Sequence, residues 1–422
     1  MIVKNEGIGE EYTLIKHRSG ADIIICPKKG FSKYYAIVGT KYGSMNNIFE
    51  QDGQRIEVPE GIAHFLEHKL FENENENVME KFGLLGAYDN AYTSFDKTAY
   101  LFTCTGHFYE CFDLLLSFVT APYFTDESVD KEQGIIAQEI KMYKDSADWC
   151  VFFNVLRALF HSNPVNIDIA GTVESIAEIT PELLYLCYRS FYKPSNMAVC
   201  VVGDVEESKV LELCDRYLKA DDDFTVKTVM PEEPSDIVRK KIEQNLSVNM
   251  PQFCIGIKDN HVDMSDARAL VKQSVATDIL INLICGETSE LHKLMYSQGL
   301  INRNFSCGYE SGANFGLSMF TGESHDPDKV FDLICAEMTA FCANGIDEKA
   351  FTRSKNALYG QFARTFNSVE RTGNMFMNTF VIGASPYDYI DAYKEIDAAY
   401  AMERLKQHFN PEYAALSVIN PV

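Results

Sequence analysis

The chain has 422 residues, of which 46% are hydrophobic and 23% charged, a composition typical of a globular protein. This length exceeds what one hydrophobic core usually organises, so two or more domains are expected. The net charge of −23 would repel a phosphate backbone and argues against nucleic-acid binding, whereas neutral or basic peptides remain compatible with it.

The sequence contains no sign of a membrane or secretory segment. No apolar run approaches the length of a bilayer span, and the first residues, MIVKNEGIGEEY, lack an apolar signal core. The twelve cysteines are spread singly and form no CxxC pair, which indicates reduced thiols. We therefore expect a cytoplasmic protein without a membrane partner.

The first chemically distinctive stretch is a predicted helix over residues 62–71, within GIAHFLEHKLF. His64 and His68 lie one turn apart on the same face, a spacing at which two imidazoles can bind one zinc ion. Glu67 lies at the edge of that face, where it could reach a water molecule held by the metal. The order H-x-x-E-H inverts the common metalloprotease motif. The alternative is a polar helix face with two hydrogen-bonded histidines.

Residues 86–104 follow as a turn and two strands. Asn90, Ala91, Tyr92 and Thr93 are expected to form a short edge strand near the histidines. An exposed edge accepts an extended peptide through main-chain hydrogen bonds. An ordinary hairpin is the alternative, and Tyr92 could either wall a side-chain pocket or pack in the core.

A second helix is expected from Thr125, whose side chain suits an N-cap. It carries Glu132 and Glu139, two turns apart and therefore on one side. A catalytic zinc needs a third protein ligand. Next to the histidine pair, the two glutamates become candidates for one ligand and one carboxylate that supports the ligands. Taken alone, they could equally be surface residues.

The end of the chain resembles its middle. Residues 178–205 and 395–422 align without a gap at an offset of 217 residues, and each reads as a helix, a proline-containing turn and a β-rich run. Thr180 and Asp397 are both suitable N-caps. We infer two homologous domains, with a chance similarity of two common helix-turn-strand units as the alternative.

The expected fold class is α+β, because several strands are joined by short turns rather than by helices. Each domain should be a mostly antiparallel sheet with helices packed on one side. The predicted boundaries are residues 1–220 for a zinc-bearing catalytic domain, 221–238 for an acidic linker, and 239–422 for a homologous metal-free domain.

Four stretches together carry a family resemblance: AHFLEHKLF, GAYDNAYTSFDKTAY, EQGIIAQEI and FYKPSNMAVCVVGDV. With the duplicated halves, they resemble the M16 zinc metallopeptidases, the pitrilysin, insulinase and mitochondrial processing peptidase group, and particularly the small bacterial members. The resemblance implies zinc bound by His64, His68 and Glu139, Glu67 as general base, and Glu132 in support. It also implies that the strand at residues 90–93 receives the substrate.

The activity implied is that of a zinc metalloendopeptidase that cleaves short or unfolded peptides in a chamber formed by two related subunits. Zinc would activate a water molecule, and Glu67 would take its proton and deliver it to the departing amine. Two imidazoles with a carboxylate suit zinc better than manganese or cobalt.

The second half lacks the metal ligands. The 217-residue offset places Ile281 and Cys285 where the histidines stand in the first half, and Lys349 and Asn356 where the two glutamates stand. We therefore expect no zinc in the second domain.

The family resemblance also implies an Arg and a Tyr, seven residues apart, that contact the peptide carbonyl in the manner of an oxyanion hole. Here Tyr296 and Asn302 stand at the expected positions, while Arg303 and Tyr309 have the wrong spacing. This departure predicts a heterodimer in which a related metal-free chain supplies the pair, with a homodimer as the second possibility.

Two other functions compete with an endopeptidase. A non-catalytic core or scaffold subunit of an M16-type complex would be expected to have lost a ligand or the base, whereas His64, Glu67, His68 and Glu139 are all present. A zinc hydrolase or lyase acting on a small molecule would not need the edge strand. The acidic run at residues 72–77 is expected to be a solvated helix extension, or else a surface that attracts basic substrate residues.

Overall fold

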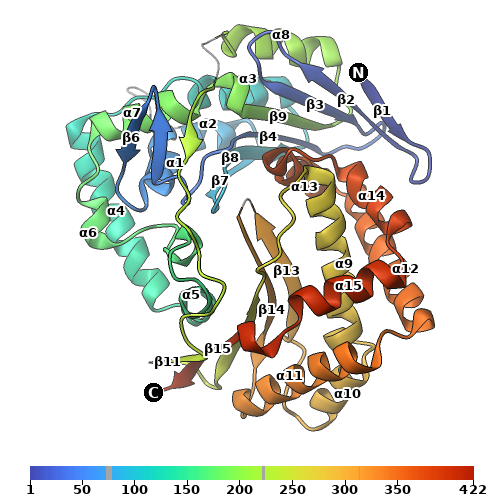
Figure 1. Cartoon of the computed structure of the whole chain (residues 1–422). Coiled ribbons are helices and arrows are strands. Elements are labelled where there is room, and N and C mark those ends of the chain that lie inside the picture. The colour runs from blue at the N-terminus through green and yellow to red at the C-terminus, as the bar shows by residue number, and fades with distance from the viewer. Residues whose placement is uncertain (73–77, 221–223, 313) are drawn as a thin grey trace. The chain divides into compact units, whose positions relative to one another are not determined.

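The structure is a computed structural model that describes residues 1–72, 78–220, 224–312 and 314–422 (Figure 1). Most of the acidic run at 72–77, and residues 221–223 of the predicted linker, lie outside the described residues. The chain forms two compact units. Unit 1 comprises residues 1–140, 168–229 and 362–386, and unit 2 comprises residues 141–167, 230–361 and 387–422.

The core of unit 1 is a seven-stranded sheet with the order β1-β2-β3-β9-β4-β8-β7. Only β3 and β9 are parallel neighbours. The strands are β1 (Ile2–Asn5), β2 (Glu10–Lys16), β3 (Asp22–Pro27), β4 (Tyr34–Thr40), β7 (Tyr88–Thr93), β8 (Thr98–Cys104) and β9 (Met197–Gly203). A small sheet of order β10-β5-β6 is formed by β5 (Ile48–Gln51), β6 (Gln54–Glu57) and β10 (Lys227–Thr228).

Helices cover both faces of the large sheet, because neighbouring residues of a strand point to opposite sides. On β4, the Thr40 hydroxyl donates to the Phe191 carbonyl in α7, whereas a side chain on Gly39 would come within 2.4 Å of Met377 in α13. The helical elements of unit 1 are α1 (Ile62–Leu70), α2 (Val78–Leu84), α3 (Phe108–Val119), α4 (Asp126–Lys144), α6 (Val173–Ile176), α7 (Pro181–Phe191), η2 (Pro194–Asn196), α8 (Glu207–Tyr217), η3 (Arg364–Asn367) and α13 (Val369–Ile382). Every residue of β9 is buried as a result, which explains its uninterrupted apolar sequence.

Unit 2 has a five-stranded sheet of order β11-β15-β12-β14-β13. The strands are β11 (Lys241–Leu246), β12 (Gln252–Lys258), β13 (Ser306–Gly312), β14 (Phe315–Glu323) and β15 (Ala414–Pro421). The helical elements are α5 (Ala147–Leu159), η1 (Pro164–Asn166), α9 (Ala267–Cys285), α10 (Glu290–Ser297), α11 (Pro327–Asn344), α12 (Glu348–Ala363), α14 (Pro386–Glu395), α15 (Ala398–His408) and η4 (Pro411–Tyr413).

The two sheets repeat one topology. The order β11-β15-β12-β14-β13 corresponds to the last five strands of the large sheet, β3-β9-β4-β8-β7. Within each set of five strands, only the first pair, β11-β15 or β3-β9, is parallel. The predicted helix-turn-strand units are α7-η2-β9 and α15-η4-β15, with Thr180 and Asp397 as side-chain N-caps. The predicted α+β class and the tandem repeat are thereby confirmed. The prediction of helices on one side of each sheet does not hold for unit 1, because α13, from the second half of the chain, covers the face opposite to α7.

The unit boundaries differ from the continuous domains predicted at 1–220 and 239–422. Helix α5 belongs to unit 2 although it lies in the first half of the chain, and α13 belongs to unit 1 although it lies in the second half. In unit 2 a side chain on Gly256, 217 residues after Gly39, would come within 2.7 Å of Leu159 in α5. An amphipathic pattern shows which face of a helix is buried, but not which sheet buries it.

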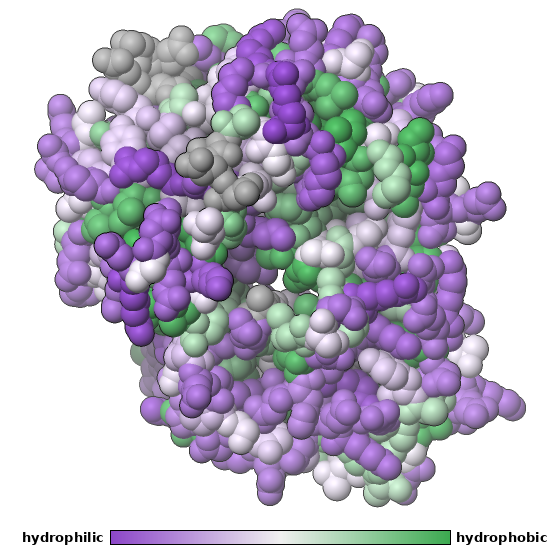
Figure 2. Space-filling model, turned by 45° about the horizontal axis from the view of Figure 1, so that its top comes forward, coloured by the Kyte–Doolittle hydropathy of each residue, from purple (hydrophilic) through white to green (hydrophobic). Residues whose placement is uncertain are grey.

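The surface carries mostly hydrophilic side chains on the face shown in Figure 2, with hydrophobic residues interspersed among them. Taken one at a time, the helices of the described ranges are too short or too polar to cross a bilayer. Only α9 and α10 together, bent by 44° at their junction, reach the required length and apolar character.

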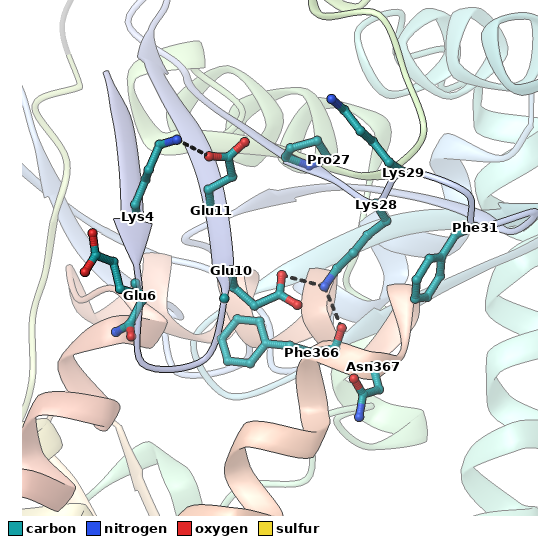
Figure 3. A pocket seen from close by; sticks show the side chains of 12 residues that line it. Lys4, Glu6, Glu10, Glu11, Pro27, Lys28, Lys29, Phe31, Phe366 and Asn367 are labelled. Atoms are coloured by element: carbon teal, nitrogen blue, oxygen red, sulfur yellow. Dashed lines mark hydrogen bonds and ion pairs between the residues drawn. The ribbon is translucent and has the colours of Figure 1, made fainter.

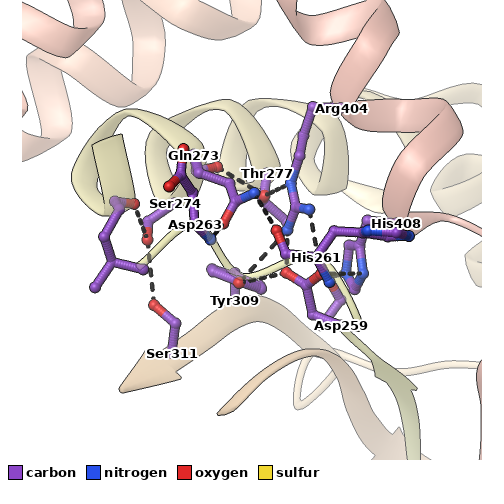
Figure 4. Close-up of polar contacts among 12 residues, drawn as sticks. Asp259, His261, Asp263, Gln273, Ser274, Thr277, Tyr309, Ser311, Arg404 and His408 are labelled. Atoms are coloured by element: carbon purple, nitrogen blue, oxygen red, sulfur yellow. Dashed lines mark hydrogen bonds and ion pairs between the residues drawn. The ribbon is translucent and has the colours of Figure 1, made fainter. Parts of the chain in front are cut away.

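A buried charged network lies at the heart of unit 2 (Figure 4). The Arg404 guanidinium is paired with the Asp259 carboxylate, and its Nε donates to the Thr277 hydroxyl at 2.8 Å. The Tyr309 hydroxyl donates to Asp259 at 2.6 Å. Burial alone would raise the pKa of Asp259, but its neighbours, Arg404 among them, hold that pKa well below its ordinary value. The network ties α15 to α9 and to the strands β12 and β13.

His408 also belongs to this network, and the equivalent positions in unit 1 are occupied by two aromatic residues. The positions of Asp259 and His408 correspond, at the 217-residue offset, to Tyr42 and Phe191, whose rings stack 4.2 Å apart. His408 Nε2 lies 2.7 Å from the Ser318 hydroxyl oxygen and is fully enclosed. Burial lowers the pKa of His408 to about 3, so the imidazole is neutral at pH 7.

We expect His408 to make the fold sensitive to acid. Its folded pKa lies below its unfolded value, so the unfolded state binds the proton first and stability is lost as the pH falls below about 6.5. Between pH 7 and pH 5 this amounts to about 2 kcal/mol. Urea denaturation at both pH values should show that loss in the wild type and a correspondingly smaller one in His408→Phe. The exposed control His325→Phe should behave like the wild type, and an unchanged pH dependence in His408→Phe would contradict the assignment.

Candidate metal centre

Helix α1 carries the two predicted histidines and lies deep in unit 1. It begins after Gly61, which has a φ of 87° and packs so closely that a side chain there would come within 2.4 Å of the Ala170 carbonyl. Apart from His68, which is partly exposed, all residues of the helix are buried. The backbone at Gly61 therefore fixes where the helix starts and which way its side chains point.

The structure brings His64, Glu67 and His68 together as the sequence predicts. One ligand atom from each lies within 4.8 Å of the others, and the imidazole rings are 4.5 Å apart at an angle of 63°. These are suitable donor types for a divalent transition metal.

Helix α4 adds the two predicted glutamates. Glu139 Oε2 lies 3.8 Å from His64 Nε2 and 3.4 Å from His68 Nε2. Two ligands at about 2.1 Å from one tetrahedral ion are about 3.4 Å apart, so these three atoms fit a single zinc ion. Glu132 Oε1 lies 3.1 Å from His68 Nδ1, the opposite nitrogen of the same ring. The seven-residue spacing thus places one carboxylate at each nitrogen of His68.

The proton affinities of the cluster suit a cation. Burial, with a contribution from His68, lowers the pKa of His64 to about 3, so its imidazole is neutral at pH 7 and has one ring nitrogen whose lone pair is free to bind a metal. Burial raises the pKa of Glu67 to about 7. Burial would lower the pKa of His68, but the hydrogen bond to Glu132 and the neighbouring carboxylates raise it instead. Three carboxyl groups around two imidazoles make the cluster attractive to a positive ion.

Strand β7 lies beside the cluster and is the last strand of the sheet within the described ranges. The Thr93 hydroxyl donates to Glu67 Oε2 at 3.3 Å. The Ala91 amide points away from β8 and is bonded only locally, to the Asn90 side chain at 2.9 Å. Tyr92 is half-buried and its hydroxyl donates to Asn374 of α13 at 3.4 Å, on the other side of the sheet. Tyr92 therefore does not face the cluster.

The Thr93–Glu67 contact was not predicted from the sequence, although a signal for it exists. Alternate residues of a strand share a face, and Ala91 and Thr93 therefore face one side while Tyr92 faces the other. Only the placement of α1 against β7 reveals that the Thr93 side reaches Glu67.

A pocket of about 520 Å³ lies elsewhere in unit 1, between the β1-β2 hairpin and η3 (Figure 3). Lys28 is buried there between the Glu10 carboxylate and the Phe366 carbonyl, each at 2.6 Å. Lys4 is paired with Glu11 at the rim, at 2.7 Å. The pocket has no histidine or cysteine, and none of its lining residues belongs to the metal cluster.

The second unit offers no comparable cluster among its described residues. Ile281 and Cys285 are buried in α9. Of the positions expected for the Arg/Tyr pair, Tyr296 is exposed on α10, and Asn302 donates to Glu323 at 2.6 Å. Tyr309 is engaged with Asp259, as described above.

Two sheets of one topology, of which only the first carries, among the described residues, a group of histidines and carboxylates that could hold a metal ion, define a duplicated fold of metallopeptidase type. The chain belongs to peptidase family M16: the model described as insulinase (peptidase family M16) matches residues 48–173, and that described as the M16 inactive domain matches residues 178–358. The predicted family is therefore confirmed by two consecutive matching regions.

Individual relatives agree with this assignment. The uncharacterized zinc protease YmfH of Bacillus subtilis is 36% identical over 387 residues, 90% of each chain. An M16-like peptidase from Alicyclobacillus acidocaldarius is 31% identical, with a TM-score of 0.95 over the whole of both chains. The beta subunit of the mitochondrial-processing peptidase of Caenorhabditis elegans is 24% identical over 335 residues, 74% of this chain and 70% of that one.

We expect Glu139→Gln to weaken zinc binding by more than about 100-fold. Removal of a group that only supports a ligand costs about 10- to 100-fold, so a larger loss is expected for a ligand itself. The affinity is measured by competition with a chromophoric chelator, and the stoichiometry by elemental analysis. Asp130→Asn, on the exposed side of the same helix, is the matched control and should bind zinc like the wild type. Wild-type affinity in Glu139→Gln would exclude this carboxylate as a ligand.

Proposed function

We propose that the chain is a zinc-dependent endopeptidase. The observation that carries this proposal is the position of Glu139 Oε2, which lies 3.8 Å from His64 Nε2 and 3.4 Å from His68 Nε2. The Glu67 carboxyl group lies beside the two histidines. Three protein ligands and a separate buried carboxylate form the minimal set for metal-assisted peptide hydrolysis.

In this proposal His64, His68 and Glu139 hold the zinc ion. Glu132 accepts the Nδ1 proton of His68 and so fixes the tautomer in which Nε2 faces the metal. Glu67 is assigned as the base rather than a ligand, as the family resemblance implies, since Glu139 Oε2 already brings a carboxylate close to both Nε2 atoms. The Glu67 carboxylate accepts a hydrogen bond from Thr93 of β7.

The bound zinc would supply Lewis acidity that polarises the scissile carbonyl and makes a water molecule acidic. Glu67 takes the proton from that water and delivers it to the departing amine. Its burial favours this role, because burial raises the pKa of the Glu67 carboxyl group and so makes the carboxylate a stronger base than an exposed glutamate. Thr93 holds the carboxylate in position between the two transfers.

The substrate class follows from β7. Residues Asn90, Ala91, Tyr92 and Thr93 lie at the edge of the sheet, where an extended peptide can add as a further strand through main-chain hydrogen bonds. Peptides that are short or unfolded can adopt that conformation, whereas a folded protein cannot without opening. A peptide strand that pairs with β7 at Thr93 would lie beside Glu67, because the Thr93 hydroxyl donates to the Glu67 carboxylate.

We further propose that the active species is a dimer with a related, metal-free chain that supplies the Arg/Tyr pair, with a homodimer as the second candidate. Tyr296 and Asn302 stand where the pair is expected, and Asn302 is already bonded to Glu323. A relative that is named as a subunit, the mitochondrial-processing peptidase beta chain, supports a paired arrangement.

A non-catalytic scaffold subunit is the alternative function. It is less well supported, because the sequence retains all four residues of the proposed centre and the fold places them together. A scaffold subunit would be expected to lack at least one of these residues, because the loss of one is enough to abolish catalysis.

Replacement of the base should separate metal binding from catalysis. Glu67→Gln is expected to retain stoichiometric zinc and to reduce kcat for a fluorogenic peptide library by about 10³-fold or more, because proton transfer is lost. Zinc content and hydrolysis are measured on the same preparation. Glu57→Gln, an exposed glutamate of β6, is the control and should keep full activity. Equal turnover by Glu67→Gln and the wild type would refute the mechanism.

The dimer proposal predicts a gain of activity on mixing. The purified chain, alone and after addition of a metal-free M16-type homologue that carries an Arg/Tyr pair, is assayed with the same peptides and sized by light scattering. We expect hydrolysis to rise at least about tenfold and to track the heterodimer, since the loss of one oxyanion-type donor costs 10²–10³ in kcat. Full activity of the chain by itself would exclude the heterodimer.

A further inference from the structure

Helices α1 and α4 are joined at a second place, beyond the metal cluster. Lys69, directly after His68, donates to the Ser128 carbonyl at 3.2 Å and is paired with the Glu72 carboxylate. The other oxygen of Glu72 accepts from Lys131 at 3.1 Å. We call Lys69, Glu72, Ser128 and Lys131 the Lys69 clasp. It connects the end of α1 with the first two turns of α4.

The clasp is strong at Lys69, because that side chain is completely buried. A buried ammonium group without partners is very unfavourable, so its contacts to Ser128 and Glu72 must persist as long as the fold does. Burial would raise the pKa of Glu72, but hydrogen bonds from Lys69 and Lys131 hold it below the ordinary value, which keeps the carboxylate charged. Lys131 is exposed, and its ion pair contributes little by comparison.

The contacts that α4 makes with the end of α1 lie on one side of α4, spaced along its axis. Lys69 binds at Ser128, and His68 binds at Glu132, one helical turn further along α4. Two turns beyond that, Glu139 meets the Nε2 atoms of both histidines. Adjacent residues of α1 thus contact successive turns of α4, and a shift of α4 along its axis would move all three contacts at once.

The other described side-chain anchor of α4 in this region does not reach α1. Gln133 donates to the carbonyls of Ala177 and Ile179, in the segment that leads into α7. This bond holds α4 against a different part of unit 1. Among the described polar contacts, the Lys69 clasp is therefore the one that links α1 to α4 outside the cluster, in addition to the apolar packing of α4.

We propose that Lys69 is a positioning residue of the metal centre: by holding the first turns of α4 against the end of α1, it sets the place of Glu139 relative to His64 and His68. This inference rests on the proposed function in one respect, that Glu139 is a zinc ligand. Lys69 itself touches neither substrate nor metal ligand atoms in this role.

The test uses the full-length chain and zinc alone as the probe. Lys69→Met keeps an unbranched side chain of nearly the same length and removes the ammonium group. We expect its zinc affinity, measured by chelator competition, to fall 10- to 100-fold, the range found when a group that orients a ligand is removed. The matched control is Lys144→Met in the exposed last turn of α4, which should retain wild-type affinity.

A double-mutant cycle shows whether Lys69 acts through Glu139. In the Glu139→Gln background the Lys69→Met change should cost less than about twofold in zinc affinity, because the ligand that it positions is already gone. Glu72→Gln, which removes the charged partner of Lys69 and leaves the buried lysine in place, gives the second variant in case Lys69→Met does not fold. It should show the same background dependence.

The outcomes separate this inference from the proposed function. Wild-type zinc affinity in both folded variants, accompanied only by a lower melting temperature of the metal-free protein, would reduce the clasp to a structural role and overturn the proposal. An equal loss of affinity with and without Glu139 would overturn it as well. Failure of the proposed function would appear elsewhere, as a wild-type chain that binds no zinc or whose hydrolysis ignores Glu67→Gln.

Discussion

The arrangement of the candidate metal centre depends on the two contacts that the His68 imidazole makes with helix α4. One ring nitrogen meets Glu132 and the other meets Glu139, both from the same helix. A single side chain of α1 thus contacts α4 twice; in the proposed centre, one contact would orient the imidazole and the other would bring a second ligand to the metal. His64, Glu67 and Thr93 derive their positions from the same arrangement, since α1 is fixed at its start by the tight packing at Gly61 and along its side by β7.

Burial gives each member of the cluster its chemical character. His64 and Glu67 lie on the same short helix and are almost equally enclosed, yet burial keeps the imidazole unprotonated and makes the carboxyl group easier to protonate. The first effect suits a ligand and the second a base. One shielded environment thus shifts the two pKa values in opposite directions, although the residues are only three positions apart.

The local features of the sequence predicted much of the centre. The four-residue spacing of His64 and His68 and the seven-residue spacing of the glutamates express helical geometry directly. The choice of Glu139 over Glu132 as the ligand depended on family resemblance, because spacing treats the two alike. Lys69 was not predicted at all: within an apolar helix a lysine reads as a solvent contact, and only the folded structure shows that it is enclosed.

The feature that the sequence predicted least well is the exchange of helices α5 and α13 between the two sheets. The repeat predicted two domains with one topology, and the strand orders bear this out. It did not predict that α5 would serve the second sheet and α13 the first, because both helices have the amphipathic pattern that any sheet could cover. Each exchanged helix meets its sheet at a glycine, Gly39 or Gly256, where the missing side chain admits a close approach.

This exchange makes the two halves of the gene mutually dependent. A polypeptide that stopped after the first sheet would leave the side of β4 and β9 that α13 covers exposed as bare apolar surface, and it would also carry an orphan α5. Either half taken alone would therefore lack a helix that its own sheet needs for burial.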